Sequence, residues 1–428
     1  MKKPKIIFIH QNFPGQFLDI APYLAEKLSA EVRFLSYSNN EQQIKLTGVT
    51  LDKISRHRDV NNNIHHYLHS TEAAVLNGQA VIRKLHELSS KGYQPDIVIT
   101  HAGFGFSNYV RCILPNCKIV AYAEWYFTRE NVLNLMPSID IDRLMSLETQ
   151  NIPIMQDTLS ADLIICPTKW QASQFPKRIA STIEVIFDGV NTKLFHDGFH
   201  SGNLKLEGSD LSEPIVIQAD TPLLTYGTRG MEPMRGFPQF MRAAAYAQKR
   251  IPDLQVVIFG KDIIAYGMND TTCPNESGSW KKSMIEELAD DLDLSRIHFT
   301  GLITYGSLAK LFRRTNLHCY FTEPYVVSWG VFQAAASGCP LLTNNFPGLD
   351  EVIKEKQRSH CVNLKDQTKI NKAVASLLKK PADNTERECN LASGKTLANA
   401  RQIWLEKINE LANNVVQPTK QQTQGGNE

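Results

Sequence analysis

Two arginines stand six residues apart in the stretch Gly227-Thr-Arg229-Gly-Met-Glu-Pro-Met-Arg235-Gly, which follows an apolar run. Each guanidinium is a planar fork of N–H donors that matches the oxygens of a phosphate group. Two such forks in one strand-to-helix loop can hold both phosphates of a diphosphate. They also stabilise the charge that builds on a departing diphosphate. We therefore predict that Arg229 and Arg235 bind a diphosphate and act in catalysis.

A second anion-binding element is predicted at Ser328-Trp329-Gly330, where a helix begins after an apolar strand. The first turn of a helix presents unpaired backbone N–H groups and the positive end of the helix dipole. This arrangement suits a diphosphate and needs no metal ion. The small residues 334–338 allow the helix to lie close to a sheet, so the segment is half of a nucleotide site.

Polar residues also follow apolar strands in the first half of the chain. His101 ends one strand and Glu124 ends the next, and Gly15-Gln16 lies in the loop after the first strand. Side chains at the carboxyl ends of parallel strands are poorly placed for core packing and well placed for a ligand. We predict that Glu124 binds a hydroxyl or orients a nucleophile and that His101 assists it. The Gly15-Gln16 turn lets backbone approach phosphate oxygens.

The elements that position these residues are short apolar runs alternating with helical patterns, which predicts parallel sheets with helices on both faces. The predicted strands of the first half are 5–10, 31–36, 96–100, 118–123, 162–166 and 184–187, and those of the second half are 223–227, 254–260, 297–300, 317–321 and 340–343. The fold class is therefore α/β, with two doubly wound, Rossmann-like domains.

The pattern also sets the domain boundaries. It stops after Asp188, which predicts an N-terminal domain 1–190, a linker 191–214 and a C-terminal domain 215–395. A helical pattern at 396–414 is expected to join the first domain. The Gln-, Asn- and Gly-rich end, 415–428, is expected to be disordered.

Several segments resemble the family 4 retaining glycosyltransferases, and the resemblance covers nearly the whole chain. The segment 321–345 is similar to the family's donor-binding stretch, in which an acidic residue and a short apolar run precede Glu-Ala-Met-Ala-x-Gly-Cys-Pro. Further similar segments are the first loop at 10–17, His101-Ala-Gly-Phe-Gly105, Pro167-Thr-Lys-Trp170, Asp188-Gly-Val-Asn191 and the arginine loop at 227–237. The resemblance implies the GT-B architecture, in which two Rossmann-like domains face each other.

The resemblance further implies that a nucleotide-diphosphate sugar, with a UDP-sugar favoured, donates its sugar to an acceptor hydroxyl with retention of configuration. It implies no cofactor and no metal. Donor binding is assigned to residues of both halves of the chain: Gly15, Gln16, Gly227, Arg229, Arg235, Gly301, Leu302, Glu323, Tyr325, Ser328, Trp329, Gly330 and Gln333. Two positions depart from the family pattern, because Gln333 replaces a Glu and Glu124 stands near a position that carries His in relatives. A Gln at 333 can still exchange hydrogen bonds with ribose hydroxyls.

Composition restricts the location and the partners. A formal net charge of +2 with 21% charged residues does not indicate a nucleic acid partner. The chain has no apolar run of about 20 residues that could span a bilayer, and its eight cysteines are scattered. We expect a cytoplasmic protein, and the sequence leaves open a peripheral contact with the inner face of a membrane.

Alternatives remain at this point. A catalytically silent protein that binds a sugar nucleotide or a partner would explain Gln333, and an epimerase or phosphorylase could have the same fold. The acceptor is a glycan, a lipid, a peptide or a small metabolite, and neither the sugar nor the base is defined.

Overall fold

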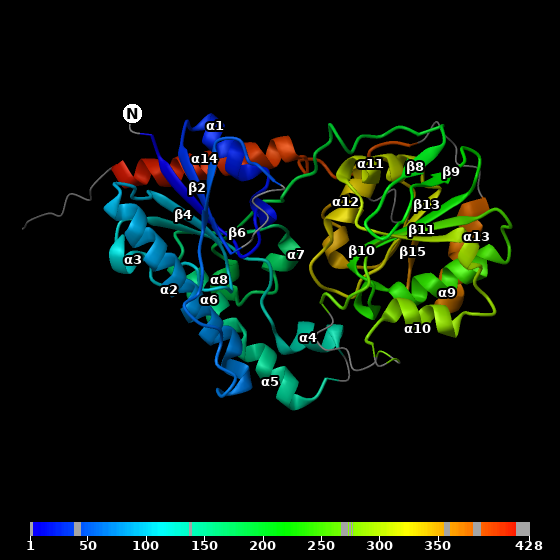
Figure 1. Ribbon diagram of the computed structural model, residues 1–428, viewed down its shortest axis with the longest axis horizontal. Coiled ribbons are helices and arrows are strands. Elements are labelled where there is room, and N and C mark those ends of the chain that lie inside the picture. The colour runs from blue at the N-terminus through cyan, green and yellow to red at the C-terminus, as the bar shows by residue number, and fades with distance from the viewer. Residues whose placement is uncertain are drawn as a thin grey trace, which may run out of the picture. The chain divides into compact units, whose positions relative to one another are not determined.

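The computed structural model describes residues 3–37, 44–136, 139–266, 273, 275, 277–354, 360–379 and 387–416. The described residues divide into two compact units, one within Met1–Asp188 together with Ala398–Glu428 and the other within Gly189–Leu397. Each unit has its own parallel sheet with flanking helices (Figure 1), so the fold is α/β with two Rossmann-like units. Residues 417–428, in the tail expected to be disordered, lie outside the described residues.

The first unit contains a seven-stranded sheet of order β3-β2-β1-β4-β5-β6-β7. Every pair of neighbouring strands is parallel, so their carboxyl ends meet at one edge. The strands are β1 (Lys5–Ile9), β2 (Glu31–Ser36), β3 (Val49–Lys53), β4 (Ile97–His101), β5 (Lys118–Tyr122), β6 (Leu163–Cys166) and β7 (Ile183–Val185).

Alternate side chains of β1 enter two cores, one on each face of this sheet. Ile6 and Phe8 pack with residues of α1 (Ile20–Lys27) and α14 (Leu397–Val416), whereas Ile7 and Ile9 pack with α2 (His69–Ser90) and α3 (Val110–Ile113). Both faces are therefore covered (Figure 1), as is typical of parallel sheets. The remaining helices of the unit are η1 (Gly15–Phe17), η3 (His66–Leu68), α4 (Arg129–Leu135), α5 (Ile141–Thr149), α6 (Asn151–Ser160), α7 (Lys169–Ala172) and α8 (Lys177–Ala180).

Helix α14 belongs to the first unit although it follows the whole second unit in sequence. Trp404 and Ile408 are buried in the α1 core. Arg401 pairs with Asp19 at 3.2 Å, and Lys407 pairs with Glu184 at 2.9 Å. Apolar burial therefore holds the helix in place, and the partly exposed ion pairs add little.

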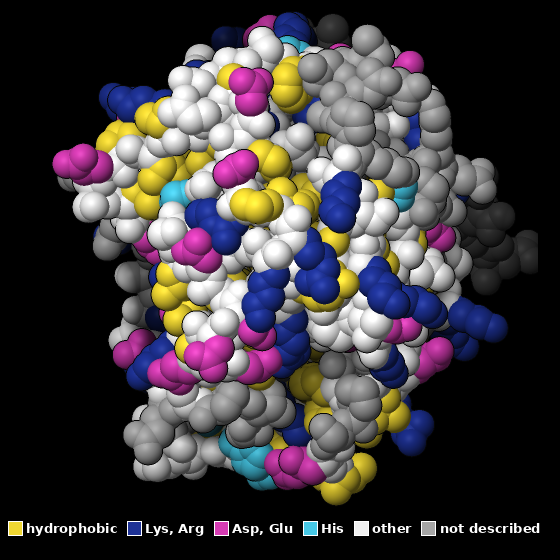
Figure 2. Space-filling view, turned by 90° about the vertical axis from the view of Figure 1, so that its right-hand side faces the viewer, with side chains coloured by type: hydrophobic (Ala, Val, Ile, Leu, Met, Phe, Trp, Pro, Cys, Tyr) yellow, Lys and Arg dark blue, Asp and Glu magenta, His cyan; other side chains and the backbone are white. Residues whose placement is uncertain are grey.

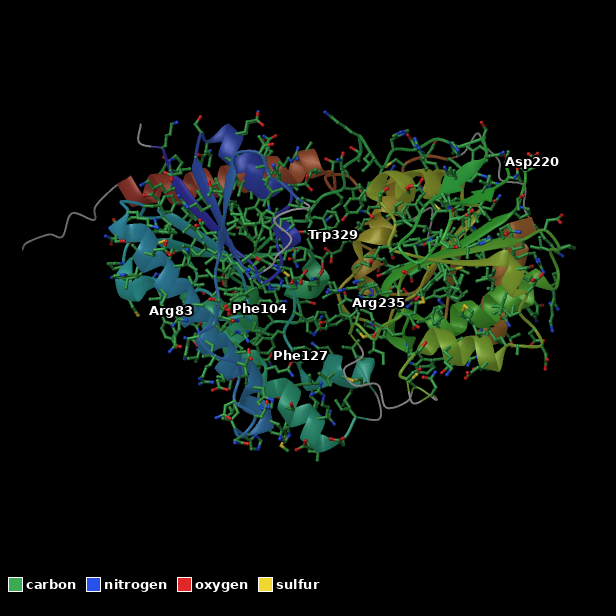
Figure 3. All side chains as sticks on the ribbon, viewed as in Figure 1. Arg83, Phe104, Phe127, Asp220, Arg235 and Trp329 are labelled. Carbon is green, nitrogen blue, oxygen red and sulfur yellow. The ribbon has the colours of Figure 1, made fainter. Side chains whose placement is uncertain are left out.

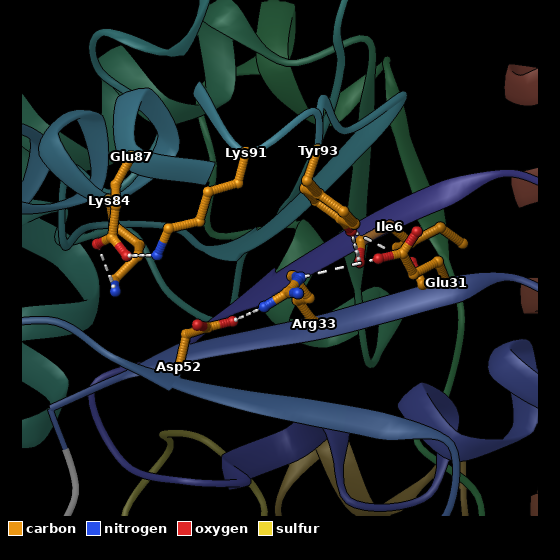
Figure 4. A network of polar contacts seen from close by, with 8 residues as sticks. All are labelled: Ile6, Glu31, Arg33, Asp52, Lys84, Glu87, Lys91 and Tyr93. Carbon is orange, nitrogen blue, oxygen red and sulfur yellow. Dashed lines mark hydrogen bonds and ion pairs between the residues drawn. The ribbon is translucent and has the colours of Figure 1, made fainter. Parts of the chain in front are cut away.

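A polar network crosses strands β1 to β3 (Figure 4). The Tyr93 hydroxyl donates to the carbonyls of Ile6 and Glu31 at 3.3 and 3.2 Å, and Arg33 lies over its ring. Arg33 also donates to Asp52 at 2.7 Å. Since Asp52 lies on edge strand β3, this network fixes that strand to the sheet.

The second unit contains a six-stranded parallel sheet of order β12-β11-β10-β13-β14-β15. Helices α9, α10 and α13 pack on one face, where Tyr226 and Phe240 stack at 4.6 Å. On the other face, Phe312 of α11 packs against the buried His318 ring. The elements are β10 (Leu223–Gly230), η4 (Pro233–Arg235), α9 (Phe237–Gln248), β11 (Gln255–Lys261), α10 (Trp280–Glu287), η5 (Leu294–Arg296), β12 (Ile297–Gly301), α11 (Tyr305–Arg314), β13 (Leu317–Tyr320), α12 (Trp329–Ala336), β14 (Leu341–Asn344), η6 (Pro347–Leu349), β15 (Cys361–Val362) and α13 (Gln367–Lys379).

The segment 191–214, predicted as a linker, is packed onto the second unit. It contains β8 (Leu204–Leu206), which pairs with β9 (Ile215–Ile217) in a small antiparallel sheet. Leu204 and Leu206 are buried, so their apolar side chains account for the attachment. The segment is therefore part of the second unit.

The surface carries charges of both signs. Figure 2 shows lysine and arginine side chains interspersed with acidic ones on the face that it presents, in keeping with the formal net charge of +2. Within the described ranges, no helix combines the length and the apolar composition needed to cross a membrane.

Candidate active site

An ion pair lies at the carboxyl edge of the first sheet, between neighbouring strands β4 and β5. Nε2 of His101 is 3.0 Å from Oε2 of Glu124, and Nδ1 of His101 is 3.0 Å from the carbonyl oxygen of Ala102. Both ring nitrogens therefore face acceptors, which suits an imidazolium. Gln171 donates to the Glu124 carbonyl at 3.0 Å and fixes its backbone.

The two partners hold each other in the charged state. Burial opposes the charge of His101, but the hydrogen bond and charge of Glu124 outweigh it, so the pKa of His101 is raised. Burial likewise opposes ionisation of Glu124, and the hydrogen bonds from His101 and Gln16 outweigh it, so the pKa of Glu124 is lowered. The Glu124 side chain keeps 26% of its surface exposed. Glu124 is therefore a carboxylate that still reaches solvent.

Gly15 and Gln16 lie beside this pair. The φ angle of Gly15 is +54°, and a Cβ there would be 2.6 Å from Nδ1 of His10, so both backbone and space require glycine. Gln16 donates to Glu124, while its Oε1 is buried without a partner in the described structure. Burial, together with the nearby His101, lowers the pKa of His10 to about 4, so this second imidazole is neutral at pH 7. The structure thus brings the four predicted residues of the first unit together.

Arg235 is buried at the carboxyl edge of the second sheet. Only 2% of its surface is exposed, and its Nη1 donates to Oγ1 of Thr322 at 2.7 Å and to the Val326 carbonyl at 3.0 Å. Figure 3 shows Arg235 and Trp329 at one edge of the unit and Asp220, which precedes β10, at the opposite edge. Arg235 therefore braces the loop between β13 and α12 from within.

Arg229 is exposed, and its guanidinium lies over the same Tyr266 ring as that of Arg235. The guanidinium carbons of Arg229 and Arg235 lie 5.8 and 4.7 Å from the ring centre of Tyr266. Cation–π contacts of this kind favour a guanidinium over an aromatic face. Tyr266 has no sequence signal beyond its place in the loop after β11, and sequence reasoning did not select it.

The start of α12 lies next to this arginine group. Ser328 caps the helix, since its Oγ accepts from the Gly330 N–H at 3.4 Å, and its own N–H donates to the Tyr320 hydroxyl at 3.0 Å. Trp329 is 37% exposed in the first turn. The positive end of the helix dipole therefore adds to the charge of the two arginines.

Three other predicted donor residues surround this helix start. Glu323 and Gln333 are half-buried, and Tyr325 packs its ring 5.7 Å from that of Tyr266. Burial raises the pKa of Glu323, and the charge of Lys365 opposes that rise. Gln333 lies one turn into α12.

Gly227, Gly301 and Leu302 have other neighbours. A Cβ on Gly227 would be 2.0 Å from the Phe259 ring, so internal packing alone requires glycine there. Gly301 has φ +64° and faces the turn that contains Ser209. The Leu302 N–H donates to Oγ of Ser209 at 2.8 Å, and the Leu302 carbonyl accepts from the Ser209 N–H at 3.0 Å. The backbone N–H and carbonyl of Leu302, a residue assigned to donor binding, thus have partners within the protein.

The second unit thus presents two guanidinium groups, a helix start and aromatic rings at the carboxyl edge of a parallel sheet. Ligands of open α/β sheets bind at this edge, and the donor set suits a diphosphate. In the described part of the chain, no group of three His, Cys, Asp or Glu side chains is placed to hold a metal ion. Two Rossmann-like units, one of which carries such a site, are the arrangement expected of a GT-B glycosyltransferase.

Family models confirm this class. The model described as glycosyl transferase family 4 group matches residues 29–195, and the model described as glycosyl transferases group 1 matches residues 214–393. The chain belongs to the family 4 glycosyltransferases, a family of sugar-transferring enzymes.

Solved structures agree in fold. HepE from Anabaena, in complex with UDP and glucose, matches with a TM-score of 0.65 and 12% identity over 95% of this chain and 100% of that chain. Sucrose-phosphate synthase from Thermosynechococcus elongatus matches with a TM-score of 0.62 and 16% identity over 96% and 97% of the two chains. At these identities the likeness supports the fold alone. None of the curated proteins matches the chain significantly in sequence.

Proposed function

We propose that the protein transfers a sugar from a UDP-sugar to an acceptor hydroxyl, with retention of configuration and without a metal. The observation that carries this proposal is the grouping of Arg229, Arg235 and Tyr266 beside the start of α12. UDP is favoured because HepE was solved with UDP and with UDP-glucose. Retention rests on the family resemblance.

Arg229 is the group suited to contact the diphosphate, because its guanidinium is exposed. Charge builds on the leaving phosphate oxygens as the glycosidic bond breaks, and a prepositioned cation stabilises that charge. Arg235, buried behind the loop 322–326, keeps the helix start in position. It contributes positive charge without using its own Nη1 donor for the ligand.

In the first unit, the Glu124 carboxylate is suited to accept a hydrogen bond from a sugar or acceptor hydroxyl. The His101 hydrogen bond at 3.0 Å keeps the carboxylate ionised and orients it. The buried Oε1 of Gln16 is a second acceptor for a hydroxyl beside the same pair.

A thermal-shift panel of UDP, GDP, ADP and their common sugars tests donor binding in the full chain. A ligand that binds only the folded state raises Tm. We expect UDP and at least one UDP-sugar to raise Tm in wild type and to raise it less in Arg229→Ala. If no nucleotide raises Tm, the proposed donor site is wrong.

A catalytically silent sugar-nucleotide-binding protein is the second candidate, and Gln333 is the observation that favours it. Most of the residues assigned to donor binding would then bind the nucleotide as proposed, but no sugar would be transferred. Release of UDP from a bound UDP-sugar separates the candidates. If Gln333→Glu releases UDP and wild type does not, the natural chain is the silent protein.

A further inference from the structure

A buried carboxylate packs against the loop that follows His101. It belongs to Asp157 of α6, and none of the surface of this residue is exposed. Burying a carboxylate is costly unless hydrogen-bond donors surround it, so buried acidic side chains are uncommon. The proposed function gives Asp157 no part, and its surroundings show what it does.

Three donors from the loop after β4 surround Asp157. Its Oδ2 accepts from the N–H groups of Gly103 and Gly105 at 2.8 and 3.0 Å, and its Oδ1 accepts from Oγ of Ser107 at 2.6 Å. Among the described residues, the Asp157 side chain acts only as an acceptor, which suits an ionised carboxylate. The φ angles of the two glycines are +94° and +69°, so the turn that aims two N–H groups at one oxygen requires glycine.

One peptide group joins Asp157 to His101. The Ala102 carbonyl and the Gly103 N–H belong to the same planar peptide. Its N–H end donates to Asp157 at 2.8 Å, and its carbonyl oxygen is 3.0 Å from Nδ1 of His101. Nε2 of the same ring is 3.0 Å from Oε2 of Glu124. A continuous line of hydrogen bonds therefore runs from Asp157 to Glu124, and we call it the Asp157 network.

A peptide held in this way favours a doubly protonated His101. Because its N–H donates to an anion, its carbonyl oxygen is polarised and becomes a stronger acceptor for the Nδ1–H of His101. The other ring N–H then donates to Glu124. If Nδ1 lost its proton, its lone pair would face the carbonyl oxygen, and the ring would have to turn away from Glu124 to relieve the repulsion.

Two other titratable side chains face His101 from neighbouring strands. The ring of His10, after β1, has its centre 5.5 Å from that of His101, and with a pKa lowered to about 4, mainly by burial, it is neutral at pH 7. The ring of Tyr122, on β5, lies 5.6 Å from His101, and its hydroxyl donates to Asp188 at 2.6 Å. Burial raises the pKa of Tyr122 well above its ordinary value, so this phenol is neutral as well.

The charges of the network support one another. Burial lowers the pKa of His101, but the hydrogen bond and charge of Glu124, the hydrogen bond to Ala102 and the charge of Asp157 together outweigh it, so the pKa is raised. Burial raises the pKa of Asp157, and its three hydrogen bonds and the charge of His101 oppose that rise. The imidazolium and the buried carboxylate thus each favour the charged form of the other.

We propose that Asp157 is a positioning residue of the active site, which acts through the Ala102–Gly103 peptide to hold His101 doubly protonated and directed at Glu124. Asp157 is fully buried, so its effect reaches a substrate only through His101. The consequence for sugar transfer rests on the proposed function, in which the ionised Glu124 accepts a hydrogen bond from a hydroxyl. The effect on His101 does not rest on it.

Asp157→Asn tests the proposal with little change in shape. The amide oxygen can accept from both glycine N–H groups and the amide nitrogen can donate to the Ser107 hydroxyl, so each hydrogen bond has a counterpart and the charge alone is lost. The protonation of His101 is followed by NMR of its ring C–H signals in the full chain. We expect His101 to lose its proton at a lower pH in Asp157→Asn than in wild type, because a nearby negative charge has been removed.

Two further variants complete this measurement. Asp162→Asn is the matched control, because Asp162 also accepts a backbone N–H, that of Ile119 at 2.8 Å, but lies beside the amino end of β5. It should leave the titration of His101 as in wild type. Ser107→Ala removes one donor from Asp157 and should fold even if Asp157→Asn does not. His101 should then lose its proton at a lower pH than in wild type, by less than in Asp157→Asn, because the carboxylate charge is less well stabilised.

The pH dependence of kcat/KM for UDP release from a UDP-sugar is the second readout. Since His101 is protonated in both proteins at low pH, Asp157→Asn should stay within about twofold of wild type on the acidic side of the profile and fall about tenfold below it on the alkaline side. A merely structural role of Asp157 would lower kcat/KM by the same factor at every pH, and that result would refute the positioning role.

Two results of the NMR titration would overturn the proposal. The first is a His101 titration that matches wild type in folded Asp157→Asn, or in Ser107→Ala if Asp157→Asn does not fold. The second is an equal shift in Asp157→Asn and Asp162→Asn, which would mean a general effect of net charge. If the titration shifts as expected and no UDP-sugar releases UDP in wild type, the action of Asp157 on His101 stands and the proposed function fails.

Discussion

Arg229 and Arg235 occupy different environments, so their replacement by Ala should have different effects on stability. Arg235 makes two hydrogen bonds of 3.0 Å or less and stacks on Tyr266. Its loss leaves Thr322 and the Val326 carbonyl without these bonds. Charged hydrogen bonds contribute roughly 1.5 to 3 kcal/mol each, so we expect Arg235→Ala to lower the free energy of unfolding by about 3 kcal/mol.

The expected change in Tm follows from this loss of free energy of unfolding and from the length of the second unit, Gly189–Leu397. For a domain of roughly 150 to 250 residues, 1 kcal/mol shifts Tm by about 2 to 4 °C. Arg235→Ala should therefore lower Tm by about 6 to 12 °C. Arg229→Ala removes an exposed side chain and should change the free energy of unfolding by no more than about 0.5 kcal/mol.

Turnover should fall in both variants. Losing a cation that stabilises the leaving diphosphate costs about 2 to 4 kcal/mol, which is a loss in kcat of about 30-fold or more. Thermal melts and steady-state kinetics of the full chain, with Arg235→Lys as the charge-conserving control, separate the two roles. Normal kcat in Arg229→Ala would refute its contact with the diphosphate, and an unchanged Tm in Arg235→Ala would refute its bracing role.

Three further outcomes are expected. Gln333→Glu should leave the Kd for nucleotide within about tenfold, whereas Gln333→Ala should weaken nucleotide binding because a ribose hydroxyl loses its partner. Wild-type affinity and turnover in Gln333→Ala would exclude the ribose contact. Glu124→Gln should lower the pKa of His101 observed by NMR, because burial then acts with less opposition. Because the pKa of His101 is raised in the folded state, protonated His101 stabilises the fold below pH 6.5, and this contribution is lost as the pH rises through the pKa of His101 in the folded protein. Because the pKa of Glu124 is lowered, ionised Glu124 stabilises the fold above pH 4.5, and this contribution is lost as the pH falls through the pKa of Glu124 in the folded protein. The difference in Tm between wild type and Glu124→Gln should thus be largest between pH 4.5 and 6.5, and a difference independent of pH would contradict the ion pair. Gly15→Ala should disturb His10 and weaken donor binding, as measured by calorimetry, whereas Gly92→Ala, which also has positive φ but open space around it, should affect stability only.

The sequence predicted the two α/β units because most strands are continuous apolar runs. Strand β3 was missed since no residue of Val49–Lys53 is fully buried at the sheet edge, and no apolar run marks it. Strands β8, β9 and β15 are two or three residues long and give no periodic signal. The short pair β8-β9 lies in or beside the predicted linker, so missing it misplaced that segment.

The candidate site was predictable where a charged or small residue follows an apolar strand, and not where a contact depends on strand order. His101 ends β4 and Glu124 follows β5. Both are therefore selected by the principle that ligands bind at the carboxyl ends of parallel strands. Tyr266 contacts both arginines from a loop that no pattern marks. Burial of Arg235 was also outside sequence reasoning, since a guanidinium in a strand-end loop is ordinarily exposed.

Strand order has a further consequence for the first unit. The chain passes His10 before Arg56 and His101 after it, yet the sheet order β3-β2-β1-β4-β5 places the ends of these strands along one edge. The described polar groups there change from cationic at β3 to neutral at β1 and to an ion pair at β4 and β5. An anionic group on a ligand is thus favoured at one end of this edge and disfavoured at the other, beside the Glu124 carboxylate.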